Sequence, residues 1–282
     1  MKISLLFFSI LSGMAVALIA LMPLIPQKAI GRGFFRFNAL LGLILILPFL
    51  PFNPYSNFKL PFQKDTLILS SQLINIVYFL FISFTFVLLG LIFVYSRKKI
   101  PINKMVYNGS ILWGLLALLL DSLLYRPMQG KIWWENILIP LNFISSAMLL
   151  GAALFAMLLG HWYLVQFDLD KNLLKKVSIF FCFSLGFRII TITLSLLIYW
   201  KSHVLDSETL QSILSLAGHG IFFWMRVLIG LALPALLAWM IYETAKMGAN
   251  QSCTGLLYIA VILVFMGEMV SRYMFFLKGV PL

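Results

Sequence analysis

Long apolar runs separated by short polar stretches form the pattern of this chain. Eight runs stand out, at residues 3–25, 33–51, 66–95, 105–125, 136–167, 174–200, 210–245 and 252–276. An α-helix needs about 20 predominantly apolar residues to cross a bilayer, and most of these runs reach or exceed that length. The pattern therefore predicts an all-α, polytopic transmembrane bundle of about eight helices.

Turn-forming residues mark the breaks between the runs, as at Pro26-Gln27-Lys28, Asn53-Pro54-Tyr55 and Gly248-Ala249-Asn250. No break is long enough for a soluble domain, so we expect residues 1–282 to form a single integral membrane domain. The first run is longer than the apolar region of a typical secretory signal, and no clear cleavage site follows it. We therefore expect this run to be the first span.

Composition supports a membrane protein, because 62% of the residues are hydrophobic and only 11% are charged. The net charge of +12 would favour nucleic-acid binding in a soluble protein. Here the basic residues fall in short loops between apolar runs, where they set the orientation of the chain in the membrane. We expect membrane lipids as partners and no nucleic acid.

Basic residues are unevenly divided between the two sets of loops. The odd-numbered loops and their flanks hold eleven, namely Lys28, Arg32, Arg36, Arg97, Lys98, Lys99, Lys104, Lys171, Lys175, Lys176 and Lys246. The other side holds seven, namely Lys2, Lys59, Lys64, Arg126, Lys131, Lys201 and Lys278. Because basic loops stay in the cytoplasm, both termini are predicted outside. In a bacterial inner (cytoplasmic) membrane they would be periplasmic.

The cysteines and histidines do not form a cofactor-ligand pattern. Cys182 and Cys253 are far apart and lie in no CxxC motif, so the chain is not expected to hold a metal or an iron–sulfur cluster. A haem with two imidazole ligands needs two histidines at similar depth on facing helices. His161 falls near the inner end of the fifth run, His219 in the outer half of the seventh, and His203 in a loop, so no haem is predicted.

Candidate functional residues are the polar side chains within the apolar runs, since each is costly in lipid and such groups commonly face the interior of the bundle. The ionisable members are Asp121, His161, Arg188, His219, Arg226, Glu268 and Arg272, and the weaker candidates are Asn38, Asn142, Thr191 and Tyr258. At 1.5 Å per residue, Arg188 and Arg226 lie roughly 18–21 Å below the outer end of their runs. On the same scale Glu268 and His219 lie roughly 10–12 Å below it, and Asp121 and Arg272 roughly 6–7 Å.

Some of these residues have simple structural explanations. Glu268 and Arg272 are four positions apart, so an ion pair on one face of a helix would account for both. Asp121 is close enough to the end of its run to be solvated by water or paired with Arg126. These alternatives compete with a functional site.

Arg188 and Arg226 lack a carboxylate at their own depth, which favours a site for an electronegative group or a water-filled cavity. A quinone headgroup fits such a site, because its carbonyl oxygens need donors and its reduction needs proton carriers. Hydrogen bonding of both arginines to backbone carbonyl groups is the structural alternative.

The last run contains Gly267-Glu268-Met269-Val270-Ser271-Arg272-Tyr273-Met274-Phe275-Phe276, followed by Gly279-Val280. Together with eight spans, this stretch resembles the NrfD/polysulfide reductase family of membrane subunits, which includes dimethyl sulfoxide reductase anchors. The resemblance covers the overall plan and about fourteen residues. It implies two four-helix halves, at residues 1–135 and 136–282, and a menaquinone or ubiquinone site near the outer face. It also implies an iron–sulfur or multihaem partner subunit.

We therefore predict a quinone-interacting membrane subunit of a multisubunit respiratory oxidoreductase, without a redox cofactor of its own. The predicted proton carriers are His219, Glu268 and Asp121, and His161 is assigned to an inner proton path. The predicted quinone-binding residues are Arg188, Arg226, Arg272 and Tyr273, of which Arg272 and Tyr273, with Glu268, lie on the resembling stretch. The alternatives are a non-catalytic anchor or assembly subunit and a carrier of small anions.

Overall fold

The computed structural model describes residues 3–55, 68–97, 104–125, 134–166, 169–202, 215, 218, 220–279 and 281. All regular secondary structure in these residues is helical. Eight of the described helices are long and apolar enough to cross a membrane. The prediction of an all-α bundle of about eight transmembrane helices is confirmed, and the chain is an integral membrane protein.

The spans follow the apolar runs closely. The first four are α1 (Ile3–Leu21) with η1 (Met22–Leu24), α3 (Arg32–Ile46) with η2 (Leu47–Phe52), α4 (Ile68–Ser96) and α5 (Lys104–Leu124). The others are α6 (Glu135–Val165), α7 (Lys171–Lys201), the combined α9 (Gly220–Val227), η3 (Leu228–Ala232) and α10 (Leu233–Lys246), and α11 (Asn250–Lys278). A short helix, α2 (Gln27–Ile30), precedes α3. The seventh span differs most from expectation, because its described helix begins at Gly220 and not near residue 210.

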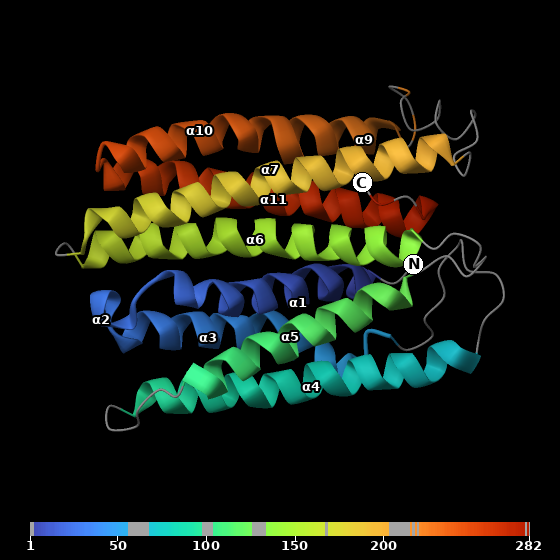
Figure 1. The fold of residues 1–282 in the computed structure, drawn as a ribbon, viewed down its shortest axis with the longest axis horizontal. Coiled ribbons are helices and arrows are strands. Elements are labelled where there is room, and N and C mark those ends of the chain that lie inside the picture. Colours follow the sequence, from blue (N-terminus) through green and yellow to red (C-terminus); the bar gives the residue numbers. More distant parts are fainter. Residues whose placement is uncertain are drawn as a thin grey trace.

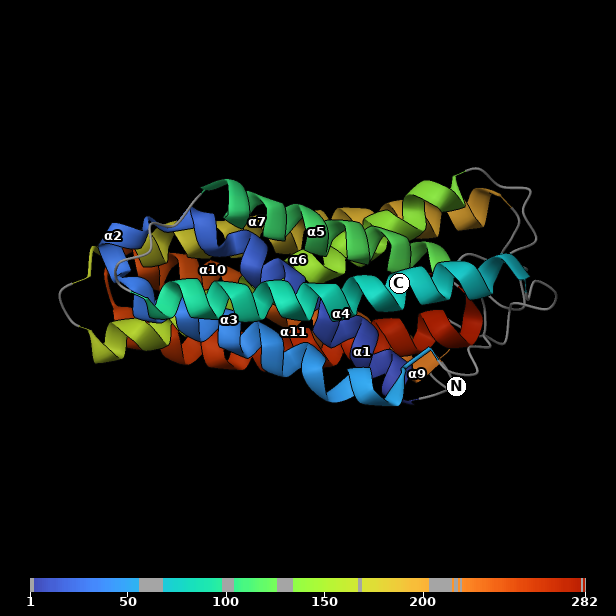
Figure 2. The same cartoon turned by 90° about the horizontal axis from the view of Figure 1, so that it is seen from below.

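The long helices lie side by side along one axis (Figures 1 and 2). The chain begins α1 and ends α11 at the same end of the bundle, which we call the termini end (Figure 1). The opposite end, called the basic end, holds the connections that follow the odd-numbered spans. The basic residues described there are Lys28, Arg32, Arg36, Arg97, Lys104, Lys171, Lys175, Lys176 and Lys246. Which end faces the cytoplasm stays a prediction.

Helices α1 and α6 form the centre of the bundle, because most of each span is buried by other helices. Small residues let them approach closely: a Cβ atom added to Gly151 would collide with Ala17. Small residues on α6 also allow close packing, since Ala152 and Ala156 are buried and Gly160 lies against Thr254 of α11. This central pair therefore joins the elements on either side of it.

Two groups of helices meet at that centre. Helices α1, α3, α4 and α5 contact one another, whereas α6 contacts α7 and α11, and both of these contact α10. One hydrophobic core runs through both groups, because α6 also packs against α1 and α5. The division into four-helix halves at residues 135 and 136 stays a prediction.

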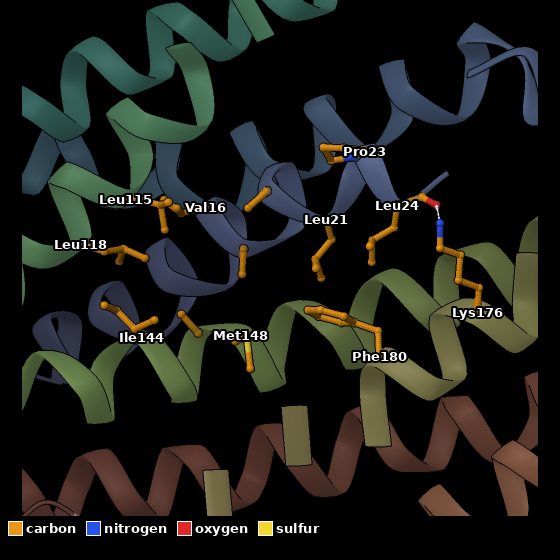
Figure 3. A pocket seen from close by; sticks show the side chains of 13 residues that line it. Val16, Leu21, Pro23, Leu24, Leu115, Leu118, Ile144, Met148, Lys176 and Phe180 are labelled. Atoms are coloured by element: carbon orange, nitrogen blue, oxygen red, sulfur yellow. Dashed lines mark hydrogen bonds between the residues drawn. The ribbon is translucent and has the colours of Figure 1, made fainter. Parts of the chain in front are cut away.

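An apolar groove of about 360 Å³ lies beside the contact between α1 and α6 (Figure 3). Helices α5 and α7 also line it, and Lys176 lies at its basic end. The smallest residues that line it are Ala17, Ala20 and Ala147. The groove is separate from the polar residues described next.

Candidate functional site

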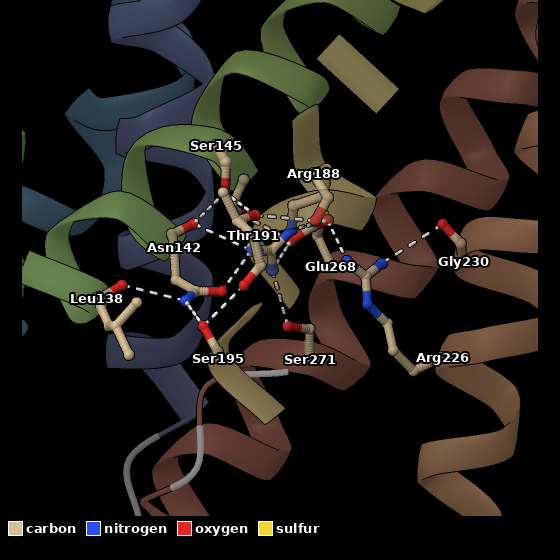
Figure 4. A network of polar contacts seen from close by, with 11 residues as sticks. Leu138, Asn142, Ser145, Arg188, Thr191, Ser195, Arg226, Gly230, Glu268 and Ser271 are labelled. Carbon is tan, nitrogen blue, oxygen red and sulfur yellow. Dashed lines mark hydrogen bonds and ion pairs between the residues drawn. The ribbon is translucent and has the colours of Figure 1, made fainter. Parts of the chain in front are cut away.

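Glu268 of α11 lies at the centre of a buried cluster of polar side chains (Figure 4). Its Oε1 accepts hydrogen bonds from Arg226 Nη2 at 2.6 Å and Arg188 Nε at 3.0 Å. Its Oε2 accepts from Arg188 Nη2 at 3.0 Å and Ser146 Oγ at 2.6 Å. Three helices, α6, α7 and α9, thus each contribute a side chain that donates to a single carboxylate on α11.

The expectation that Arg188 and Arg226 lack a carboxylate is wrong, because both form ion pairs with Glu268. For Arg226, the error came from the predicted start of the seventh span. The apolar pattern starts this span near residue 210, but α9 begins at Gly220, so Arg226 lies only about 9 Å along the helix from that end. Glu268 lies about 15 Å from the end of α11, within reach of a long arginine side chain.

The remaining N–H groups of the Arg188 guanidinium donate hydrogen bonds to neutral acceptors. Its Nη1 lies 2.8 Å from Asn142 Oδ1 and 3.2 Å from both Asn142 O and Ser145 Oγ, and Nη2 also donates to Ser271 Oγ at 3.1 Å. Asn142 in turn donates to Ser195 Oγ at 2.6 Å. This arrangement holds the Arg188 side chain, which is 2% exposed, in one position between α6, α7 and α11.

Two glycines allow Arg226 to reach Glu268. A Cβ atom at Gly267 would collide with Gly230, and it would come within 2.9 Å of Arg226 Nη1. Gly230 belongs to the π-helical segment η3, and its carbonyl oxygen accepts from Arg226 Nη1 at 3.4 Å. Such π-helical insertions occur frequently at functional sites. The close approach of η3 and α11 therefore positions the second arginine.

Arg272 does not form the expected ion pair with Glu268. Its guanidinium carbon lies 3.5 Å from the centre of the Phe143 ring. No carboxylate among the described residues lies within ion-pair distance of Arg272. Arg272 and Arg188 line a cavity of about 10 Å³ together with Asn142, Phe143, Ser271, Phe275 and Pro281. That volume is close to the minimum that holds one water molecule.

Asp121 forms a second polar site in the neighbouring group of helices. Its Oδ1 accepts from the hydroxyl groups of Tyr55 at 2.7 Å and Tyr125 at 3.1 Å. Burial raises the pKa of the Tyr55 phenol well above its usual value and the Asp121 carboxylate raises it further, so Tyr55 remains a donor. Asp121 Oδ2 is buried and has no hydrogen-bond partner among the described residues. The predicted partner Arg126 lies outside the described residues.

The other predicted residues lie elsewhere. Tyr273 packs against Phe222, with ring centres 5.3 Å apart, and is not part of the Glu268 cluster. His161 is exposed near the basic end of α6, where Nδ1 lies 2.7 Å from the hydroxyl of Tyr258. His219 lies outside the described residues. The structure therefore brings together Arg188, Arg226 and Glu268 of the predicted set.

Neutral polar residues complete the cluster. The sequence had marked some of them as weaker candidates and others not at all. They are Asn142, Ser145 and Ser146 on α6, Thr191 and Ser195 on α7, and Ser271 on α11. Ser145 and Thr191 hydroxyl oxygens lie 3.0 Å apart. Their three- and four-residue spacing puts Asn142, Ser145 and Ser146 on one face of α6, a signal that was present in the sequence.

The described residues of the cluster are rich in hydrogen-bond donors. Three arginines (Arg188, Arg226 and Arg272) and three acidic residues (Asp121, Glu135 and Glu268) are buried among the described residues. No group of three or more potential metal-binding side chains occurs among the described residues, and Cys182 and Cys253 are free thiols.

No protein-family model, curated protein or solved structure was found to match the chain.

Proposed function

We propose that this chain is a quinone-interacting membrane subunit of a respiratory oxidoreductase. The observation that carries the proposal is the pair of buried arginines held on Glu268, with a third buried arginine, Arg272, lining the same small cavity as Arg188. Ionisable groups buried in a membrane bundle commonly mark substrate or proton pathways. A quinone carbonyl, and the anion formed on its reduction, would accept hydrogen bonds from such donors.

Glu268 has a positioning role in this proposal. Its oxygens already accept four hydrogen bonds from Arg188, Arg226 and Ser146, so it has little remaining capacity to bind a ligand. Holding both arginines rigid would prepare donors for a developing negative charge. Its earlier assignment as a proton carrier stays a prediction.

Asp121 is better suited to carry a proton, because one of its oxygens accepts two phenolic hydrogen bonds while Oδ2 has no partner among the described residues. A general acid or base needs an oxygen that can change protonation without breaking an ion pair. Asp121 is linked to Arg272 through Tyr125, which donates to Asp121 and stacks on Phe143, the ring beneath the Arg272 guanidinium group. In this proposal Asp121 carries the proton and Arg272 donates to the headgroup.

The headgroup would enter beside Arg272. The cavity there is water-sized, so binding requires Arg272 to leave Phe143 or the residues around Pro281 to separate. Phe143 and Phe275 would then provide aromatic faces for the quinone ring. Electrons would pass to or from an iron–sulfur or multihaem partner subunit.

Quinone content of the purified protein tests the proposal. We expect organic extraction to yield menaquinone or ubiquinone in near-stoichiometric amount, and Arg272→Leu to reduce it at least tenfold. Glu243→Gln is the matched control, because Glu243 is exposed and pairs only loosely with Lys246 at 3.8 Å. A quinone site would be excluded if the same amount of quinone were extracted from the wild type, from Arg272→Leu and from a detergent blank.

A non-catalytic anchor or assembly subunit is the second candidate. It is favoured because the hydrogen bonds around Glu268 are already satisfied within the protein. Every polar hydrogen of the Arg188 guanidinium group faces an acceptor. A purely structural cluster would make Arg272→Leu change stability without changing quinone content. An anion carrier is less favoured, because α4 is a continuous helix and does not repeat the interruption seen in the seventh span.

A further inference from the structure

We propose that the groove beside α1 and α6 binds one acyl chain of an anionic phospholipid, whose phosphate contacts Lys176. This site is distinct from the Glu268 cluster and does not depend on a quinone function. Its occupant follows from the shape of the groove, the chemistry of its walls and the charge at its end.

The shape fits an elongated apolar chain. The groove has a volume of about 360 Å³, within the range of ligand sites, and opens between helices. Three lining residues, Ala17, Ala20 and Ala147, have small side chains, and larger apolar side chains line the rest of the groove (Figure 3). The larger lining residues are Val16, Leu21, Leu24, Leu115, Leu118, Ile144, Met148 and Phe180.

The walls favour a hydrocarbon over a quinone headgroup. Lys176 is the only charged side chain among the lining residues of this groove, and every other lining side chain is apolar. A quinone ring would need donors for two carbonyl oxygens at separate positions, whereas an acyl chain needs none. The groove therefore suits the tail of a lipid whose polar group remains at the end.

Lys176 supplies charge complementarity at that end. Its Nζ donates to Leu24 O at 3.0 Å, which holds the ammonium group at the mouth (Figure 3). The side chain is exposed, and an ammonium group has two further N–H donors for phosphate oxygens. Lys176 also lies at the basic end, where basic residues attract anionic lipids. Phosphate on Lys176 would direct one acyl chain along the groove toward Ile144.

Native mass spectrometry of the purified protein tests this site with phosphatidylglycerol and phosphatidylcholine that carry identical chains. We expect one phosphatidylglycerol to remain bound at collision energies that remove phosphatidylcholine. Ala20→Phe should abolish this retention, because the phenyl ring would occupy the groove. Lys176→Gln should weaken it about fivefold, the effect expected for one basic side chain near an anionic headgroup.

Lys175→Gln is the matched control, because it removes the same charge from the adjacent residue of α7, which does not line the groove. It should retain phosphatidylglycerol as the wild type does. Equal retention of the two lipids, or equal loss in Lys175→Gln and Lys176→Gln, would overturn the proposal. So would retention by Ala20→Phe at the wild-type level, or loss of a bound quinone and not of phospholipid in that variant.

Discussion

Arg188 and Glu268 form two parallel hydrogen bonds, from Nε to Oε1 and from Nη2 to Oε2, each 3.0 Å long. Both side chains are almost inaccessible to solvent. Arg226 pairs with the same carboxylate at 2.6 Å, so one acid compensates two buried arginines. A planar guanidinium group suits this two-point contact, which a lysine could not reproduce.

Removing the Glu268 charge should strongly destabilise the protein. Glu268→Gln would leave Arg188 and Arg226 buried without a counter-charge, and breaking such a pair typically costs about 3–5 kcal/mol. We expect a clear fall in the Tm of the detergent-solubilised protein. Glu243→Gln, which removes an acid from an exposed pair, should change the Tm little. Similar Tm values for the two variants would contradict a compensating role for Glu268.

The glycine contact between η3 and α11 gives a second prediction. Gly267→Ala should destabilise the protein by about 1–3 kcal/mol, because the added methyl group would collide with Gly230 and crowd Arg226. Gly255→Ala is the matched control on the same helix, since open space surrounds that position. Unfolding measured with increasing denaturant should show a loss in the first variant alone. Equal stability of both variants would refute the close packing.

Much of the fold could be predicted from the sequence because each span must satisfy its own backbone hydrogen bonds in lipid and present apolar side chains. Helix lengths follow directly from these two requirements. The start of the seventh span was predicted less well, since apolar residues continue before Gly220 and composition alone does not mark a helix end. That single boundary also displaced Arg226 in depth.

The partners in the site were harder to predict than its members. Arg188, Arg226 and Glu268 were identified because charge is rare in a membrane span. Their pairing depends on which helices are neighbours and on the Gly230–Gly267 approach, which a spacing pattern within one helix does not report. For the same reason the four-residue spacing left an ion pair between Glu268 and Arg272 as an alternative, although their side chains have different partners.

Arg272 should tolerate lysine poorly. Its guanidinium carbon lies 3.5 Å from the centre of the Phe143 ring, and a desolvated cation–π contact contributes up to about 2 kcal/mol. Arg272→Lys keeps the charge but not the planar group. We expect a lower Tm in Arg272→Lys and a similar loss in Phe143→Leu. Combining the two should cost less than the sum of both losses, and strict additivity would show that the contact contributes little.

The distribution of basic residues predicts that the termini end faces the periplasm. Alkaline phosphatase fused after the last residue should therefore be active in a bacterial host, whereas the same enzyme inserted after Gly248 should be inactive. Gly248 lies in the short connection between α10 and α11 at the basic end. The reverse activity pattern would place the Lys176 groove in the outer leaflet.

Asp121 provides the test that separates proton transfer from packing. Asp121→Asn preserves the shape of the side chain and an oxygen that can accept from Tyr55 and Tyr125, but it removes the protonatable carboxyl group. If Asp121 carries protons, quinol oxidation by the complete complex should fall at least a hundredfold, in the range by which a single acid or base contributes. Tyr55→Phe is the structural comparison, because it removes one hydrogen bond to Asp121 and leaves the carboxyl group in place. A structural role predicts similar modest losses of Tm and turnover in both variants, whereas proton transfer predicts a large loss of turnover in Asp121→Asn with a nearly unchanged Tm.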